Sequence, residues 1–132
     1  MNEELDRALV ADFPKLYRQR GGDIRDTCMC WGFECADGWE PLIRELSAKL
    51  EFLNDNTPTE VEATQVKEKF GTLRFYTGGI GGGWPWADIV FALIDETEQQ
   101  SAHVCEQCGK PGYTSGEGWL RTLCDKCQEA KP

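Results

Sequence analysis

The sequence has little of what most enzymes and most nucleic-acid-binding proteins depend on. Its 132 residues include one histidine, His103, and only 14 lysines and arginines against 23 aspartates and glutamates. A Ser-His-Asp or Cys-His catalytic system would have to use His103 as its base, because the chain has no other histidine. The GxSxG, HExxH and paired-carboxylate patterns are absent. The formal charge of −9 opposes phosphate binding, which depends on cations that release counterions. We therefore expect no enzymatic activity, and nucleic acid is a disfavoured partner.

Long apolar segments are also missing. No stretch approaches the roughly 20 apolar residues that a membrane span needs. The first residues, Met1 to Asp6, have neither a basic leader nor an apolar core. We therefore expect no membrane association and a reducing, cytoplasmic compartment, in which cysteines remain thiols or bind metal.

Two Cys-x-x-Cys pairs near the C-terminus are the most specific signal in the chain. Fifteen residues separate Cys105-Glu-Gln-Cys108 from Cys124-Asp-Lys-Cys127. Each pair lets one tight turn direct two sulfurs at a single ion, and two such turns complete a tetrahedron with Zn–S distances of about 2.3 Å. Two disulfides or four unrelated thiols are the alternatives. The spacing predicts a structural zinc ion, because four cysteines leave no open coordination position for catalysis.

The segment between the pairs has the composition of a zinc-ribbon hairpin. Gly109 follows the first pair, and two short strands, at 113–115 and 119–123, flank the turn Gly116-Glu-Gly118. So small a unit buries too little apolar surface to fold alone, and metal binding would supply the deficit. We therefore predict a zinc ribbon over residues 105–132, packed on or appended to a core formed by residues 1–104.

The remaining chain predicts an α+β core of about three helices around a small antiparallel sheet. Apolar residues at helical spacing predict a helix over 3–20, bent or restarted at Pro14, and a second over 37–53. Asp37 and Glu40 resemble a capping box at the start of the second helix. A third helix is expected from Pro85 towards His103, after a glycine-rich connector at 78–83.

Alternation over 62–76 predicts a β-hairpin. Its apolar face would carry Val66 and Phe70, and its solvated face would carry the most cationic stretch of the chain, with Lys67, Lys69 and Arg74. These three cations and the nearby aromatics are the basis of the alternative function, a nucleic-acid-binding zinc-ribbon module.

Three cysteines remain outside the two pairs. Cys28, Cys30 and Cys35 lie in an apolar, aromatic segment, and their simplest interpretation is as small buried hydrophobic residues. A second metal site completed by His103 or Asp37, or a redox or nucleophilic role, are the alternatives. His103 itself has three possible roles: a zinc ligand, a donor to a zinc-bound sulfur, or an exposed residue at a helix end.

Two features point to a protein partner. Five acidic residues gather before residue 60 and would favour a basic partner or simply maintain solubility: Asp23, Asp26, Glu34, Asp37 and Glu40. Trp84 and Trp86 adjoin the glycine-rich connector, and aromatic residues beside such backbone are typical binding anchors. Most of the five tryptophans, by contrast, are expected in the core.

Three blocks of sequence carry a resemblance to a known family: Trp31-Gly-Phe-Glu-Cys-Ala-Asp-Gly-Trp39, Gln65-Val-Lys-Glu-Lys-Phe-Gly-Thr-Leu-Arg-Phe-Tyr76, and Cys105-Glu-Gln-Cys-Gly with Thr122-Leu-Cys-Asp-Lys-Cys127. They resemble a family of small uncharacterised proteins of tailed phages and prophages, and Ala36 departs from the glycine usual at that position. The resemblance implies a phage origin and a bacterial host cytoplasm, and it implies no catalytic residue. The expected function is therefore a zinc-stabilised acidic protein that binds a host protein or complex, one form of which is an anti-CRISPR-like or DNA-mimicking inhibitor of host defence.

Overall fold

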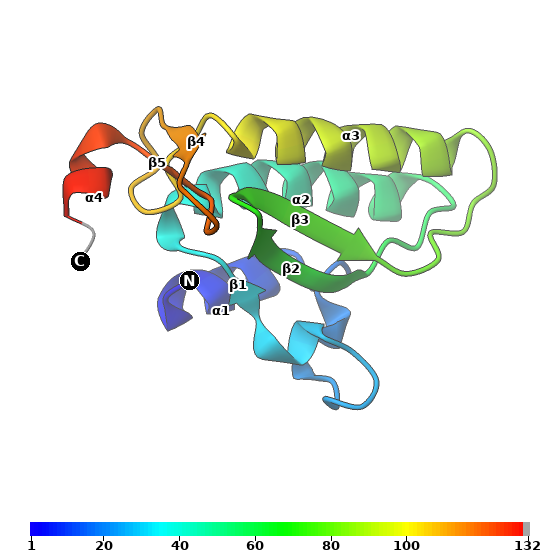
Figure 1. The fold of residues 1–132 in the computed structure, drawn as a ribbon. Coiled ribbons are helices and arrows are strands. Elements are labelled where there is room, and N and C mark those ends of the chain that lie inside the picture. The colour runs from blue at the N-terminus through cyan, green and yellow to red at the C-terminus, as the bar shows by residue number, and fades with distance from the viewer. Residues whose placement is uncertain (131–132) are drawn as a thin grey trace.

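Two long helices and a small sheet form the main layers of the protein (Figure 1). The computed structural model describes residues 1–130. Helices α2 (Glu40–Asn56) and α3 (Trp86–Ser101) lie side by side over one face of a three-stranded sheet. The strand order is β1-β2-β3, with bounds Phe33–Glu34, Ala63–Lys69 and Thr72–Thr77. The predicted α+β class is confirmed, and the sheet is mixed because the short β1 pairs with β2 in parallel.

The first helix is shorter than the spacing predicted. Helix α1 spans Glu3–Asp12 and lies next to β1. It ends before Phe13, because a residue that precedes proline avoids the helical conformation. The chain then turns so that Leu16 and Tyr17 still reach the core. The buried carboxylate of Glu51 on α2 stabilises this turn by accepting hydrogen bonds from the backbone N–H groups of Lys15 and Leu16, both at 3.1 Å.

The predicted capping box at Asp37 is wrong. Residues Asp37–Trp39 form a 3₁₀ turn, and α2 begins at Glu40 without a side-chain cap. The Asp37 carboxylate instead accepts hydrogen bonds from the backbone and side-chain nitrogens of Asn2, at 2.8 and 3.0 Å. Asp37 therefore binds Asn2, which is distant in sequence, instead of capping the N-terminus of α2. Glu40 pairs with Arg44, one turn further along the helix.

The β2–β3 hairpin is confirmed, but Phe70 is not on its apolar face. Val66 and Phe75 are cross-strand partners and are buried, as alternation requires. Phe70 and Gly71 form the two-residue turn, with φ of 55° and 87°, which is the left-handed pattern of a type I′ turn. The turn directs Phe70 into solvent, where 67% of its surface is exposed.

Side chains of α3 cover the open edge of β3. The backbone N–H of Phe75 donates to the Glu98 carboxylate at 2.7 Å, and that of Leu73 donates to the Ser101 hydroxyl at 2.9 Å. These acceptors satisfy backbone donors that would otherwise invite pairing with another chain. Burial raises the pKa of Glu98 above its ordinary value, and the N–H of Phe75 opposes that rise by stabilising the carboxylate.

Glu98 should therefore impose a measurable pH dependence on stability. Because its folded pKa is raised, the folded state holds this proton more tightly, and the stability that Glu98 contributes falls as pH rises through the folded pKa. We expect Glu98→Gln to flatten the slope of unfolding free energy against pH above 4.5, since an amide oxygen still accepts from Phe75. Glu98→Ala should cost about 1–2 kcal/mol. Urea unfolding at several pH values would measure both effects, with the exposed Glu96→Gln as the control; a slope unchanged in Glu98→Gln would contradict this prediction.

The core lies between the two long helices and the sheet. Its largest fully buried side chains include Trp39, Tyr17, Leu50 and Leu73. The expectation that most tryptophans are buried is wrong, because Trp31, Trp84 and Trp119 are exposed and Trp86 is half-buried. No helix within residues 1–130 is long and apolar enough to cross a membrane.

Candidate metal centre

The structure brings the four cysteines of the two Cys-x-x-Cys pairs to one point. The sulfurs of Cys105, Cys108, Cys124 and Cys127 all lie within 4.8 Å of one another, and those of Cys108 and Cys124 are 3.6 Å apart. Four sulfurs at about 2.3 Å from a tetrahedral zinc ion are separated by about 3.8 Å. The donor set and its spacing therefore fit a closed four-thiolate metal site.

Local backbone geometry positions each pair. After the first pair, Gly109 adopts φ +82°, and its N–H donates to the carbonyl of Cys105 at 2.9 Å. Glycine suits this left-handed position because it has no Cβ. The second pair stands at the start of helix α4 (Asp125–Glu129), with the N–H of Gln128 donating to the carbonyl of Cys124 at 2.9 Å. Strands β4 (Tyr113–Ser115) and β5 (Arg121–Leu123) join the two pairs as the predicted hairpin.

The thiols of the cluster differ in pKa because their surroundings differ. Burial of Cys105 opposes ionisation, but backbone N–H donors, including those of Cys124 and Cys108, stabilise its thiolate and lower its pKa to about 6. The pKa of Cys127 is raised to about 12, first by its hydrogen bond with Cys124 and also by burial and the neighbouring sulfurs. Four adjacent thiolates repel one another without a positive ion, so the site is compatible with a metal that compensates their charge.

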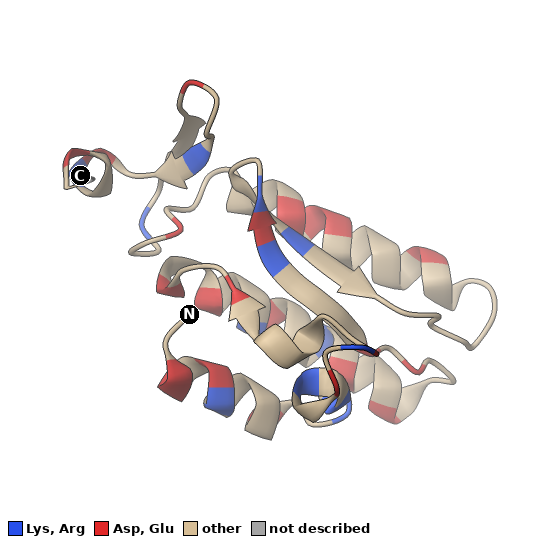
Figure 2. Ribbon diagram, turned by 60° about the horizontal axis from the view of Figure 1, so that its bottom comes forward, with Lys and Arg blue, Asp and Glu red and all other residues tan. Residues whose placement is uncertain are grey.

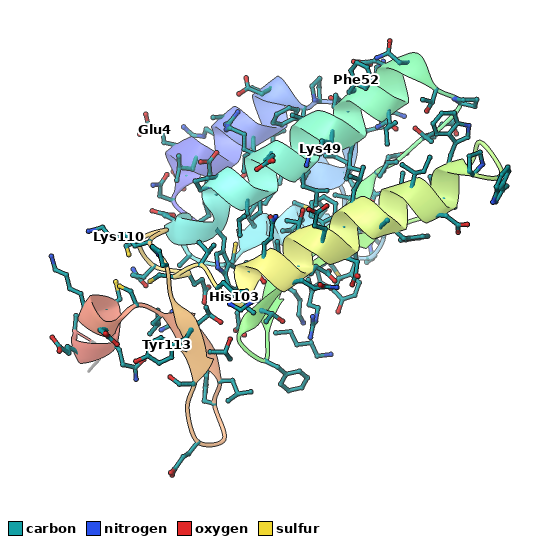
Figure 3. All side chains as sticks on the ribbon, turned by 90° about the horizontal axis from the view of Figure 1, so that it is seen from above. Glu4, Lys49, Phe52, His103, Lys110 and Tyr113 are labelled. Carbon is teal, nitrogen blue, oxygen red and sulfur yellow. The ribbon has the colours of Figure 1, made fainter. Side chains whose placement is uncertain are left out.

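His103 is not part of this group. It is exposed just beyond the end of α3, where the chain enters the ribbon (Figure 3), and its carbonyl accepts from the N–H of Gly112 at 3.0 Å. The cysteine, histidine and acidic side chains of residues 1–130 form no second cluster of this kind. The structure thus does not unite Cys28, Cys30 and Cys35 with His103 or Asp37 as metal ligands.

The three remaining cysteines differ in environment. Cys35 is buried, and desolvation raises its pKa to about 12, as expected for a small core residue. Cys30 is half-buried, with its sulfur 3.2 Å from the carbonyl oxygen of Thr27. Cys28 is exposed, so the prediction that all three are buried is wrong for this residue, which lies in an irregular segment before a 3₁₀ turn.

The first cysteine pair also attaches the ribbon to the core. Within this pair, Glu106 is buried, and its carboxylate accepts from the N–H of Ala36 at 2.9 Å. Its carbonyl accepts from the N–H of Gly38 at 2.6 Å, and the indole of Trp39 donates to the carbonyl of Val104 at 2.8 Å. Metal ligands and core thus share one hydrogen-bonded segment.

A second contact joins the two hairpins. The hydroxyl of Thr122 on β5 donates to the carbonyl of Gly71, in the turn of the β2–β3 hairpin, at 2.6 Å. The turn of the β2–β3 hairpin consequently lies against the ribbon hairpin, and each hairpin exposes an aromatic side chain. Phe70 is 67% exposed and Trp119 is 72% exposed.

This aromatic pair was not predicted from the sequence. Trp119 and Leu120 were expected within a strand, but β5 begins at Arg121 and both residues belong to the preceding turn. The glycine-containing turn sequences Phe70-Gly71 and Gly116-Glu-Gly118 were the local signals, because residues at hairpin turns project into solvent.

The five predicted acidic residues do not form one surface. Asp23 and Asp26 lie in an exposed loop, and the Asp23 carboxylate binds Arg25 at 2.9 Å. The segment from Asp37 to Glu40 lies apart from that loop (Figures 1 and 2). The side chains of Asp37 and Glu40 have the partners already described. Glu34 is exposed on β1.

The two predicted tryptophan anchors also differ. Trp84 is 85% exposed in the loop before α3, whereas Trp86 is half-buried as the first residue of that helix.

The cationic stretch does share one face of the hairpin, although acidic neighbours accompany it. Lys67 and Arg74 are directly opposed, and Lys69 follows two residues after Lys67. Glu34 is the cross-strand partner of Lys67, and Arg74 lies close enough to lower the pKa of Glu98. These acidic side chains reduce the net positive potential of the face.

The fold and the site together define an α+β protein with a ribbon-like cluster of four cysteines, compatible with a metal ion, at its C-terminal end. No family model, curated protein or solved structure matches the chain.

Proposed function

We propose that this is a zinc-stabilised binding protein whose partner is a basic protein or complex of a bacterial host. The exposure of Phe70 and Trp119 carries the proposal, because large exposed aromatic side chains on two hairpins that contact each other are anchors of the kind that protein interfaces use. The net charge of −9 favours a basic partner and speeds its association.

Zinc is the metal that best suits the site. Four cysteines at these distances are the donor set of structural zinc, whose tetrahedral geometry they can satisfy completely. Its role here would be to hold the ribbon hairpin, which carries Trp119, against the turn that carries Phe70, since the ligand-bearing pairs flank that hairpin. The resemblance to phage proteins supports a role in a host cytoplasm, where occupying a defence complex is one form of such binding.

The test is the formation of a stoichiometric complex with a purified host protein. Tagged protein with confirmed zinc content would capture partners from host lysate at low salt, and a candidate would then be purified and its affinity measured. We expect Phe70→Ala with Trp119→Ala to weaken binding by about tenfold or more, as for loss of interface anchors. Trp31→Ala is the matched control, since it removes an exposed tryptophan to which no binding role is assigned. Failure to recover any partner above background would contradict the proposal.

Nucleic acid is the alternative partner, and one observation favours it: Lys67, Lys69 and Arg74 share a face beside exposed aromatic rings. Gel shifts at increasing salt would distinguish the two, because phosphate contacts weaken steeply as salt rises. A salt-sensitive shift that is lost when the three cations are replaced would move the assignment to a nucleic-acid-binding module.

A further inference from the structure

A hollow between the β2–β3 hairpin and the ribbon has a chemically specific lining. Its volume is about 410 Å³, and it is lined by Glu68, Glu106, Trp119 and Arg121. Glu68 comes from β2, whereas the other three residues come from the ribbon. The hollow therefore exists only where the ribbon is seated against the core hairpin.

The β2–β3 turn packs closely against the ribbon hairpin. A Cβ placed on Gly71 would lie 2.9 Å from the Thr114 side chain and 3.4 Å from Leu120. This contact and the Thr122–Gly71 hydrogen bond fix the position of the ribbon hairpin, which carries Trp119, relative to strand β2, which carries Glu68.

The charges in the hollow leave one carboxylate oxygen available. Glu106 is buried, with one oxygen bound to the N–H of Ala36 and the other 3.6 Å from Arg121, so these two charges offset each other. One oxygen of Glu68 accepts from the N–H of Gly71 at 2.8 Å. Its other oxygen has no hydrogen bond or ion pair to any residue in the described part of the chain.

We infer that this hollow receives an arginine side chain of the basic protein partner, and this inference rests on the function proposed above. A guanidinium group would stack on the exposed Trp119 indole and donate to the free oxygen of Glu68. Arginine fits better than lysine because its planar, weakly hydrated group both stacks on aromatic rings and donates in a fixed direction. A phosphate group fits poorly, since the available charge in the hollow is negative.

Titration of isotope-labelled, zinc-loaded protein with the peptide acetyl-Gly-Arg-Gly-amide tests the site by NMR. We expect saturable shifts of the Trp119 indole N–H and of the backbone from Glu68 to Gly71. The lysine analogue should bind more weakly, by about threefold or more. Glu68→Gln keeps an acceptor for Gly71, so it should preserve the fold and weaken the arginine peptide by about tenfold.

Two tryptophan variants separate stacking from folding. Trp119→Ala should abolish the saturable shifts and Trp119→Phe should retain part of them, while zinc content stays at one per chain. Trp31→Ala, which removes an exposed tryptophan outside the hollow, should bind as the unmodified protein does.

Several outcomes would overturn the inference. These are shifts spread evenly over exposed acidic residues, equal binding of the arginine and lysine peptides, or full binding by Glu68→Gln. Shifts caused by a single-stranded oligothymidine but not by the peptide would also overturn it, and would indicate a nucleic-acid surface. If a purified host partner binds equally well to Glu68→Gln and Trp119→Ala, the arginine site is wrong while the proposed function stands; if no host partner exists, the proposed function fails whatever the peptide does.

Discussion

Chelation of the metal will unfold the ribbon and lower the stability of the whole chain. Residues 105–130 contain only two buried hydrophobic side chains, Cys105 and Leu123, so this segment has almost no core of its own. Structural zinc contributes roughly 10–16 kcal/mol to the folding of small zinc peptides, so the ribbon is not expected to stay folded without its metal. Because Glu106 and Val104 bind the core through Ala36, Gly38 and Trp39, loss of the ribbon also removes these contacts.

The measurement combines metal content with thermal unfolding. We expect one zinc ion per chain, and a decrease of about 10–20 °C in Tm when a strong chelator removes it. Cys124→Ser should reproduce the effect, because three thiolates and a hydroxyl form a poor zinc site.

Cys28→Ser is the matched control for the metal prediction. Cys28 is an exposed cysteine outside the cluster, so this variant should keep both its metal and its Tm. A protein that contains no metal when purified, or whose Tm is unchanged by chelation, would contradict the assignment of the four cysteines as a structural metal site.

Gly38→Ala will separate the ribbon from the core while leaving its metal ligands intact. A Cβ at this position would lie 2.3 Å from the carbonyl oxygen of Cys105 and 2.4 Å from that of Glu106. Both obstacles are backbone atoms of the metal-binding segment, so they cannot move aside as a flexible side chain would. Overpacking of this kind typically costs about 1–3 kcal/mol, and we expect the upper end of that range here.

The readouts are unfolding free energy, zinc content and the near-UV signal of Trp39. We expect a loss of about 3 kcal/mol and a changed Trp39 signal, since its indole hydrogen bond to Val104 spans the same junction. Zinc should remain bound, because none of the four ligands is altered. Gly79→Ala is the control: a Cβ there has no neighbour within 4 Å, and its stability should change little. Equal stability of Gly38→Ala and the unmodified protein would show that the docking contact is dispensable.

The metal centre and most of the elements could be predicted because their signals are local. Two residues between cysteines define a turn that aims two sulfurs at one ion, whatever surrounds it. Helical spacing located α2 and α3, and alternation located the β2–β3 hairpin, since these periods follow from backbone geometry. Their boundaries were less accurate: proline chemistry ended α1 early, and a long-range hydrogen bond to Asn2 took Asp37 from the helix start.

The candidate binding surface could not be predicted in the same way, because it is formed by residues far apart in the chain. Phe70 and Trp119 belong to different hairpins, and these hairpins lie together only because Thr122 binds Gly71 and Glu106 binds the segment before α2. No local period records such contacts. The five acidic residues from Asp23 to Glu40 are the opposite case, because they are close in sequence but the fold separates them. Three of them, Asp23, Asp37 and Glu40, bind neighbouring side chains.

Local chemistry in the chain was therefore sufficient to predict a four-cysteine metal site and an α+β core. The position of the ribbon against that core, which brings Trp119 near Glu68, was decided by tertiary packing. The physical reason is that spacing and turn composition act over a few residues, whereas docking depends on matching donors, acceptors and space across 51 or 70 residues of sequence separation.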